Sequence, residues 1–197
     1  MPTKLVYRRI SAYAGIAAPI LGFICILSAI ASHPQFSWTS NALSDLGIVS
    51  GITAPLFNFG LIASGFLAFL FAVLGLYSYF GEALVGKIGV YTFEAATLAL
   101  IGIGIFNENF EGTHYILSVA FFVFASIALF ILTFAFWTCH RHGMAVFTVL
   151  IGLAAALPWI LQFTFNYAPN VAIPEFISGI AISAWTVVLS RKILATS

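Results

Sequence analysis

Charged residues are scarce in this sequence, and their scarcity excludes most classes of soluble protein. Of 197 residues, 7 are Lys or Arg and 6 are Asp or Glu, so 7% of the chain is charged, whereas soluble domains contain roughly 25%. Hydrophobic residues make up 62%, and the mean hydropathy is +1.10. A water-soluble fold of this size cannot bury so much apolar surface beneath a polar shell. The composition therefore predicts an integral membrane protein.

The sequence also lacks a basic patch and a set of cysteines. The formal net charge is +1, so we expect no nucleic-acid partner. The two cysteines, Cys25 and Cys139, are too few for a disulfide framework. Cys139 lies beside Arg141, on the side of the membrane that we expect to be reducing. We expect both thiols to be unpaired, and the sequence indicates no cofactor.

Long apolar runs account for most of the chain. As helices rising about 1.5 Å per residue, they can each cross the ~30 Å hydrocarbon core. Lipid offers no partners for backbone groups, and the runs are too long and too uniformly apolar for barrel strands, so helices are the remaining choice. The sequence predicts an all-α polytopic membrane protein, a single domain over residues 1–197. Its six spans are expected at residues 10–31, 55–80, 88–106, 114–138, 144–165 and 172–190.

The basic residues predict the orientation of these spans. With six spans, all seven fall on one side of the membrane: Lys4, Arg8, Arg9, Lys87, Arg141, Arg191 and Lys192. The positive-inside rule places this side, with both termini, in the cytoplasm. A basic start before an apolar run also resembles a signal peptide, but this run is longer than a typical signal-peptide core. We therefore expect a multi-pass protein of the cell membrane that contacts membrane lipids and can also contact other membrane subunits.

The most polar stretch follows the first run, at residues 37–47, on the side that we expect to be outer. Asn41, Ser44 and Asp45 can all bond backbone amides in turns or cap a short helix. If the stretch is helical, Asn41 and Ser44 share one face. Two interpretations remain open, a capped interfacial helix and a polar site that faces the outer leaflet.

A second polar cluster, at residues 107–114, contains Glu108, Glu111 and His114. Glu111 and His114 are three residues apart, so they share a face if the fourth helix begins by Glu111. This spacing suits a carboxylate that orients an imidazole, or two ligands of one metal. The alternative is that acids at a helix start are stabilised by the helix dipole and that the histidine is interfacial.

Glu94 is the one acid expected inside a span. A carboxylate within a span is costly and normally turns towards the bundle interior or towards water. We therefore expect Glu94 to face the interior. It would form either a hydrogen bond between helices or part of a proton or substrate pathway, and one carboxylate gives little support for a transport pathway.

Two short motifs carry a resemblance to a known family. The segment Asn41-Ala42-Leu43-Ser44-Asp45-Leu46-Gly47 and the later Glu111-x-x-His114 resemble the DUF998 family of small prokaryotic and archaeal membrane proteins. More distantly, both motifs are similar to the Frag1/DRAM/Sfk1 group, some members of which act in lipid or lipid-anchor remodelling. The resemblance implies a six-span fold and a connection with lipids, but it implies no particular reaction.

Two functions of different classes follow from these residues. The first is a lipid hydrolase or acyltransferase at the outer leaflet, with Ser44 or a water as nucleophile and His114 as base, oriented by Glu111 or Asp45. A metal variant of it would use Asp45, Glu111 and His114 and leave a position open for water. The first function requires Asp45 and His114 to lie in one network beside a cavity.

The second function is a non-catalytic subunit of a membrane complex, for example a respiratory one. Small all-helical subunits with few polar residues in their spans fit that role. A haem between helices would need two facing ligands, and on the outer side only His33 and His114 are available.

Overall fold

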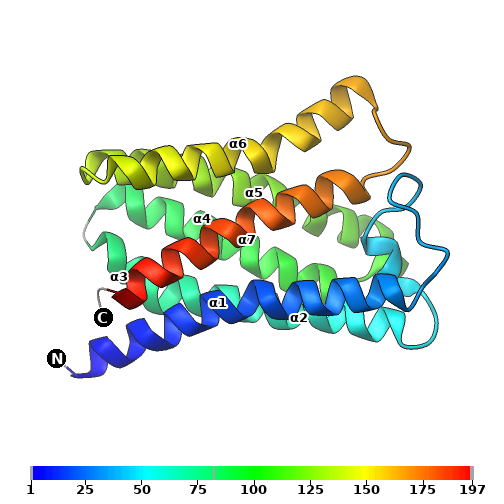
Figure 1. Cartoon of the computed structure of the whole chain (residues 1–197), viewed down its shortest axis with the longest axis horizontal. Coiled ribbons are helices and arrows are strands. Elements are labelled where there is room, and N and C mark those ends of the chain that lie inside the picture. Colours follow the sequence, from blue (N-terminus) through cyan, green and yellow to red (C-terminus); the bar gives the residue numbers. More distant parts are fainter. Residues whose placement is uncertain (1, 82, 196–197) are drawn as a thin grey trace.

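Six long helices make up the fold, and each is long and apolar enough to cross a membrane. The computed structural model describes residues 2–81 and 83–195, and these ranges contain no strand. Two short 3-10 helices, η1 (Ser44–Ile48) and η3 (Glu108–Phe110), lie in the connections. The all-α membrane fold predicted from the sequence is confirmed. Figure 1 shows these six helices. Five of them are single elements: α1 (Pro2–Ala31), α4 (Leu84–Ile105), α5 (Glu111–Thr138), α6 (His142–Phe165) and α7 (Ala172–Ala195). The remaining one, second in chain order, is a continuous helix made of α2 (Thr53–Phe71), the π-helical turn η2 (Ala72–Leu76) and α3 (Tyr77–Phe80).

Each apolar run lies within one of these helices, apart from a residue or so at its ends. The helices extend furthest beyond the apolar runs where basic residues adjoin the run. α1 extends back to Pro2, beyond the apolar run that begins at Ile10. Lys and Arg are good helix formers, and a proline in the first turn needs no hydrogen-bond partner, so the helix continues past the apolar run. α7 likewise continues through Arg191 and Lys192.

The six helices form a closed ring. α1 packs on α2, α2 on α4, α4 on α5, α5 on α6, α6 on α7, and α7 returns to α1. Successive helices run in opposite directions, so the connections alternate between the two ends (Figure 1). One end, here called the loop end, holds residues 32–52, 106–110 and 166–171.

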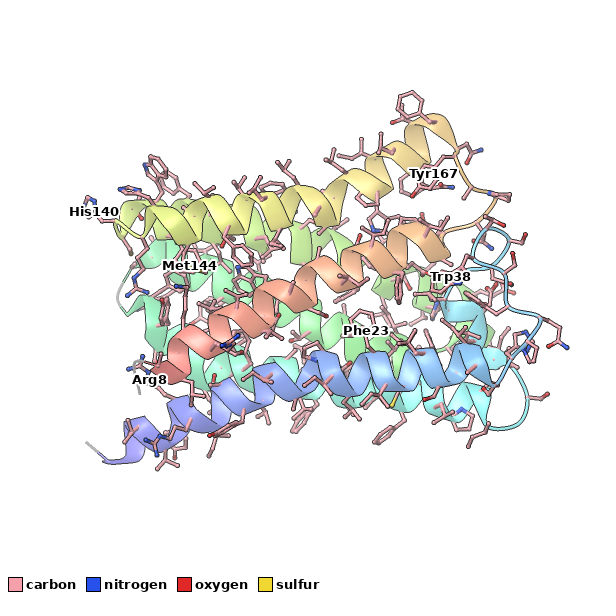
Figure 2. All side chains as sticks on the ribbon, viewed as in Figure 1. Arg8, Phe23, Trp38, His140, Met144 and Tyr167 are labelled. Carbon is pink, nitrogen blue, oxygen red and sulfur yellow. The ribbon has the colours of Figure 1, made fainter. Side chains whose placement is uncertain are left out.

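The opposite end, here called the basic end, holds the start of α1, the end of α7 and the α5–α6 connection. In Figure 2, Arg8 and His140 lie at the basic end, whereas Trp38 and Tyr167 lie at the loop end. The arrangement brings the basic residues of the sequence to one end of the bundle. That this end faces the cytoplasm stays a prediction.

Two clusters of buried side chains fill the ring. In the larger cluster, the Phe71 ring lies 6.3 Å from the Phe93 ring and 6.4 Å from Trp185. The smaller cluster lies at the loop end and includes Leu43 and Leu46, which belong to the connection between α1 and α2. This connection therefore folds back over the helix ends and contributes to the core.

Glycines allow α2 and α4 to approach closely. A Cβ atom added at Gly104 would lie 2.7 Å from the backbone oxygen of Asn58, and one at Gly65 would lie 3.1 Å from the backbone oxygen of Thr97. Small residues at helix contacts are the usual means of close packing in membranes. The backbone contact between α2 and α4 thus depends on these two positions.

Candidate functional site

The polar stretch at residues 37–47 is ordered by the side chain of Asn41. Asn41 Oδ1 accepts a hydrogen bond from Ser37 N at 2.9 Å, and its Nδ2 donates to Asp45 Oδ2 at 2.7 Å. The same carboxylate oxygen accepts from Ala42 N at 3.0 Å. Asn41 and Asp45 therefore fix the turn between Ser37 and Asp45, whereas Leu43, the N-cap residue of η1, forms no side-chain capping hydrogen bond.

Two carboxylates hold this turn against other parts of the chain. Leu43 N donates to Glu175 Oε2 of α7 at 2.6 Å, and the Ser44 hydroxyl donates to Glu108 Oε1 of η3 at 2.7 Å. Leu43, Ser44 and Glu175 are all buried. The turn is thus fastened to the segment before α5 and to the start of α7.

Two asparagine side chains also bind the backbone of η1, at Gly47. Gly47 O accepts from Asn58 Nδ2 of α2 at 2.9 Å and from Asn107 Nδ2 at 3.3 Å. Asn107 also accepts from Asn109 N at 3.2 Å, which caps η3. Sequence reasoning did not single out Asn58. Its only signal was an amide side chain within an otherwise apolar run.

His114 is buried in the first turns of α5 and has a defined tautomer. Its Nδ1 lies 2.8 Å from the backbone oxygen of Phe106. Because a carbonyl oxygen only accepts, Nδ1 carries the proton, and in the neutral ring Nε2 is then an acceptor. The hydroxyl of Ser118, one helical turn further along α5, lies 3.4 Å from Nε2. Ser118 was also missed from the sequence, although its spacing of four residues from His114 was visible.

Glu108 links the two parts of the loop end. It interacts electrostatically with His114, and with Asp45 both electrostatically and through a side-chain hydrogen bond. Glu175 interacts electrostatically with Glu108 and Asp45. Glu108 is therefore the group that interacts with both Asp45 and His114.

The remaining predicted residues lie apart from this group. Glu111 is exposed at the start of α5. The imidazole of His114 is oriented by the backbone oxygen of Phe106, whereas the sequence suggested the carboxylate of Glu111 for this role. Glu94 is half-buried in α4 and interacts electrostatically with Tyr91. Within residues 2–81 and 83–195, no three His, Cys, Asp or Glu side chains are grouped so that they could hold a metal ion.

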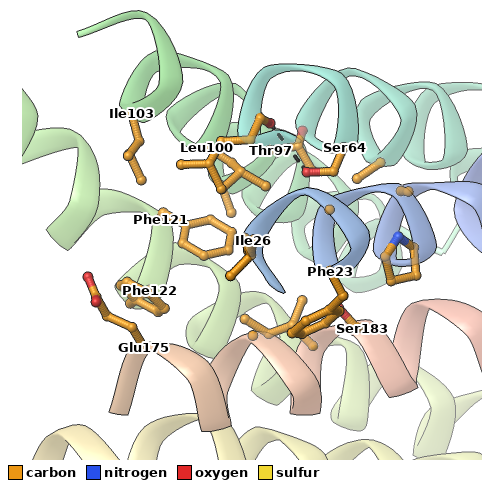
Figure 3. A pocket seen from close by; sticks show the side chains of 18 of the residues that line it. Phe23, Ile26, Ser64, Thr97, Leu100, Ile103, Phe121, Phe122, Glu175 and Ser183 are labelled. Atoms are coloured by element: carbon orange, nitrogen blue, oxygen red, sulfur yellow. Dashed lines mark hydrogen bonds between the residues drawn. The ribbon is translucent and has the colours of Figure 1, made fainter. Parts of the chain in front are cut away.

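A cavity of about 140 Å³ lies inside the ring, below this polar group. Five helices, all except α6, contribute to its wall, and its lining is mainly apolar. Figure 3 shows Phe23 and Ile26 of α1, Phe121 of α5 and Glu175 of α7 around it.

The cavity is long in the direction of the helices. On α7 its lining runs from Glu175 to Thr186, a separation of about 16 Å along a helix axis. That is roughly half of the ~30 Å hydrocarbon core.

Five hydroxyl groups of the wall fall into two kinds by their hydrogen-bond partners. Ser64, Thr97 and Thr186 bond carbonyls of their own helices. Ser44 and Ser118 instead bond the side chains of the loop-end group, so the polar chemistry of the cavity is concentrated near that end.

Comparison with known protein families identifies a match. A family model described as "Protein of unknown function (DUF998)" matches residues 16–192. No curated protein and no solved structure matches the chain.

Proposed function

We propose that this chain, which belongs to the DUF998 family, binds one hydrocarbon chain of a membrane lipid in its central cavity. The observation that carries the proposal is a long apolar cavity inside a bundle of membrane-spanning helices, with its polar groups near one end. Spaces between the helices of a bundle are common ligand sites. A cavity of about 140 Å³ suits part of one narrow chain rather than two.

The length of the cavity and its position in the membrane support a lipid as ligand. The cavity extends from the loop end over about half of the hydrocarbon core, which is the depth that acyl chains of one leaflet reach. With the basic end in the cytoplasm, this is the outer leaflet of the cell membrane.

The polar end selects among lipids. A lipid chain gains little by leaving the bilayer for the cavity, since both are apolar. Affinity must therefore come from packing and from the polar group of the lipid. The loop-end segments, residues 32–52, 106–111 and 166–175, include the acids Asp45, Glu108 and Glu175 and contain no Lys or Arg. A phosphate would find no Lys or Arg partner there, so the site favours an uncharged or cationic polar group.

Photo-cross-linking tests this proposal. A lipid with a diazirine halfway along its acyl chain is incorporated with the protein into phosphatidylcholine nanodiscs, and cross-linked peptides are identified by mass spectrometry. We expect cross-links to lining residues such as Ile26 and Phe121. Gly179→Leu should lower them roughly tenfold, the effect of about 1.4 kcal/mol in binding free energy. A Cβ atom at Gly179 meets Phe23 only at 3.8 Å, so the added side chain occupies cavity space rather than displacing a helix.

Gly143→Leu is the matched control, since Gly143 is exposed at the basic end and a Cβ atom there meets nothing within 4 Å. Its cross-linking should equal that of the unchanged protein. Cross-links confined to exposed apolar residues such as Ile127 and Phe134, and insensitive to Gly179→Leu, would contradict a lipid in the cavity. They would favour the alternative role as a non-catalytic subunit of a membrane complex.

A further inference from the structure

We propose that Ser118 and His114 form a nucleophile and base pair that cleaves the acyl ester of a lipid held in the cavity, an activity that rests on the proposed function. The pair is made within α5, where residues four apart share one face. Ser118 lines the cavity, and its hydroxyl lies 3.4 Å from His114 Nε2. Catalytic hydrogen bonds are often this long before substrate binds.

The tautomer of His114 is the one that a general base requires. The carbonyl of Phe106 holds the proton on Nδ1, so the lone pair of Nε2 is directed to the Ser118 hydroxyl. Phe106 follows the last residue of α4, and its backbone N donates to Gly102 O at 2.8 Å. The last turn of α4 therefore holds Phe106 in place. The backbone thus orients the imidazole in the way that a carboxylate does in a hydrolase triad.

Ser118 is better placed than Ser44 to act as nucleophile. The Ser44 hydroxyl already donates its proton to Glu108 at 2.7 Å, whereas the Ser118 hydroxyl lies against the free acceptor of the imidazole. Glu108 also interacts electrostatically with His114. In its ionised form this carboxyl group would stabilise the imidazolium that forms when the base accepts a proton.

The depth of Ser118 agrees with the position of a lipid ester. It lies seven residues after Glu111 at the start of α5, which is about 10 Å along the helix axis. The lining continues past it towards the middle of the bundle, to Phe93 and Thr186. A chain in the deeper part of the cavity therefore leaves its ester near Ser118 and its polar group near the loop end.

The reaction needs no cofactor. Ser118 Oγ forms a bond to the ester carbonyl carbon while its proton passes to His114 Nε2. The bond between that carbon and the alcohol oxygen then breaks, and the alcohol leaves with the proton from Nε2. A water attacks the acyl-serine and gives its proton to Nε2. The fatty acid then leaves, and the proton returns to Ser118. The net change is ester and water to acid and alcohol.

A serine-reactive probe tests the pair. The whole protein in nanodiscs is treated with an alkyl fluorophosphonate, whose phosphorus is attacked by an activated serine with loss of fluoride, and the labelled residue is identified by mass spectrometry. We expect the label on Ser118. Ser118→Ala should remove it, and His114→Gln should slow labelling roughly 10²-fold or more, the usual contribution of a general base. Ser183→Ala is the control, because Ser183 lines the same cavity.

Photo-cross-linking of the lipid, measured in parallel, separates this inference from the proposed function. If the lipid cross-links in the cavity but Ser118 remains unlabelled, the pair is structural and only lipid binding stands. If label appears on Ser44 or Ser183 instead, Ser118 is not the nucleophile. If cavity cross-links are absent, the proposed function fails as well. The labelled site in the unchanged protein decides the matter even where a variant does not fold.

Discussion

At the scale of single residues, the loop end is held by hydrogen bonds between groups far apart in the chain. Glu175 accepts from Leu43 N across 132 positions, and Glu108 accepts from Ser44 across 64. Both bonds join the turn at residues 37–47 to elements that arrive later in the chain. A buried donor that loses its partner costs about 1–3 kcal/mol, so each bond contributes to the position of the turn over the cavity.

Glu175 provides the sharpest residue-scale prediction. Glu175→Ala leaves the buried Leu43 N–H without its acceptor, and we expect the free energy of unfolding to fall by about 1–3 kcal/mol. Glu175→Gln keeps an acceptor oxygen at this place and should lose distinctly less. Thermal unfolding in detergent and the rate of proteolysis within residues 37–47 measure both effects. Equal losses for the two variants would show that the acceptor role is not what matters.

At the scale of elements, individual side chains and glycines determine how neighbouring helices contact each other. The π-helical turn η2 (Ala72–Leu76) follows α2, and the hydroxyl of Ser11 on α1 donates to the carbonyl of Phe71, the last residue of α2, at 2.8 Å. Such turns are rare and mostly occur as single turns within a longer helix. The α2–α4 contact instead depends on the absence of a side chain at Gly65 and Gly104.

A single methyl group tests the α2–α4 contact. In Gly104→Ala the new Cβ would lie 2.7 Å from a backbone oxygen of α2, which cannot move away alone. The two helices must separate, and overpacking of this kind costs about 1–3 kcal/mol. Gly112→Ala is the control, because a Cβ there meets nothing within 4 Å and alanine favours a helix by up to about 1 kcal/mol. The melting temperature should therefore fall for the first variant and hold or rise for the second. A fall of equal size in both would refute the close contact.

At the scale of the whole molecule, charge is divided between the two ends. The basic end collects Lys and Arg from the start of α1, the start of α4, the α5–α6 connection and the end of α7. The loop end carries acids instead: Asp45, Glu108, Glu111 and Glu175. Basic connections are retained in the cytoplasm during insertion. The division therefore predicts that the cavity and its polar group belong to the outer half of the membrane.

Cysteine accessibility tests this orientation. In a background with Cys25 and Cys139 replaced by Ala, we introduce Thr39→Cys at the loop end and Gly143→Cys at the basic end, both at exposed positions. An impermeant thiol reagent added to intact cells should label the first variant and spare the second, and cell lysis should expose the second. The opposite pattern, or labelling of both in intact cells, would overturn a cytoplasmic basic end.

The sequence by itself determined the fold class and the helices. Apolar runs long enough to cross a bilayer leave the backbone only one way to satisfy its hydrogen bonds, so each run had to be a helix. Since each run crosses the bilayer in turn, successive helices had to be antiparallel. The polar stretches at residues 37–47 and 107–114 were also visible, because polar residues are conspicuous against an apolar background. The π-helical turn at Ala72–Leu76 was not visible, since no residue type specifies one.

Only the tertiary structure decided which polar groups meet. The sequence offered Glu111 as the partner of His114 because carboxylates are visible in a sequence, whereas the actual partner is the backbone oxygen of Phe106, a group that every residue carries. The Leu43–Glu175 bond was hidden because it depends on how the ring closes. The spacing of four residues between His114 and Ser118 was visible, but only the structure shows that the hydroxyl lies near Nε2 and lines a cavity. The cavity likewise arises from five helices packed together, and no single segment encodes the space that they leave.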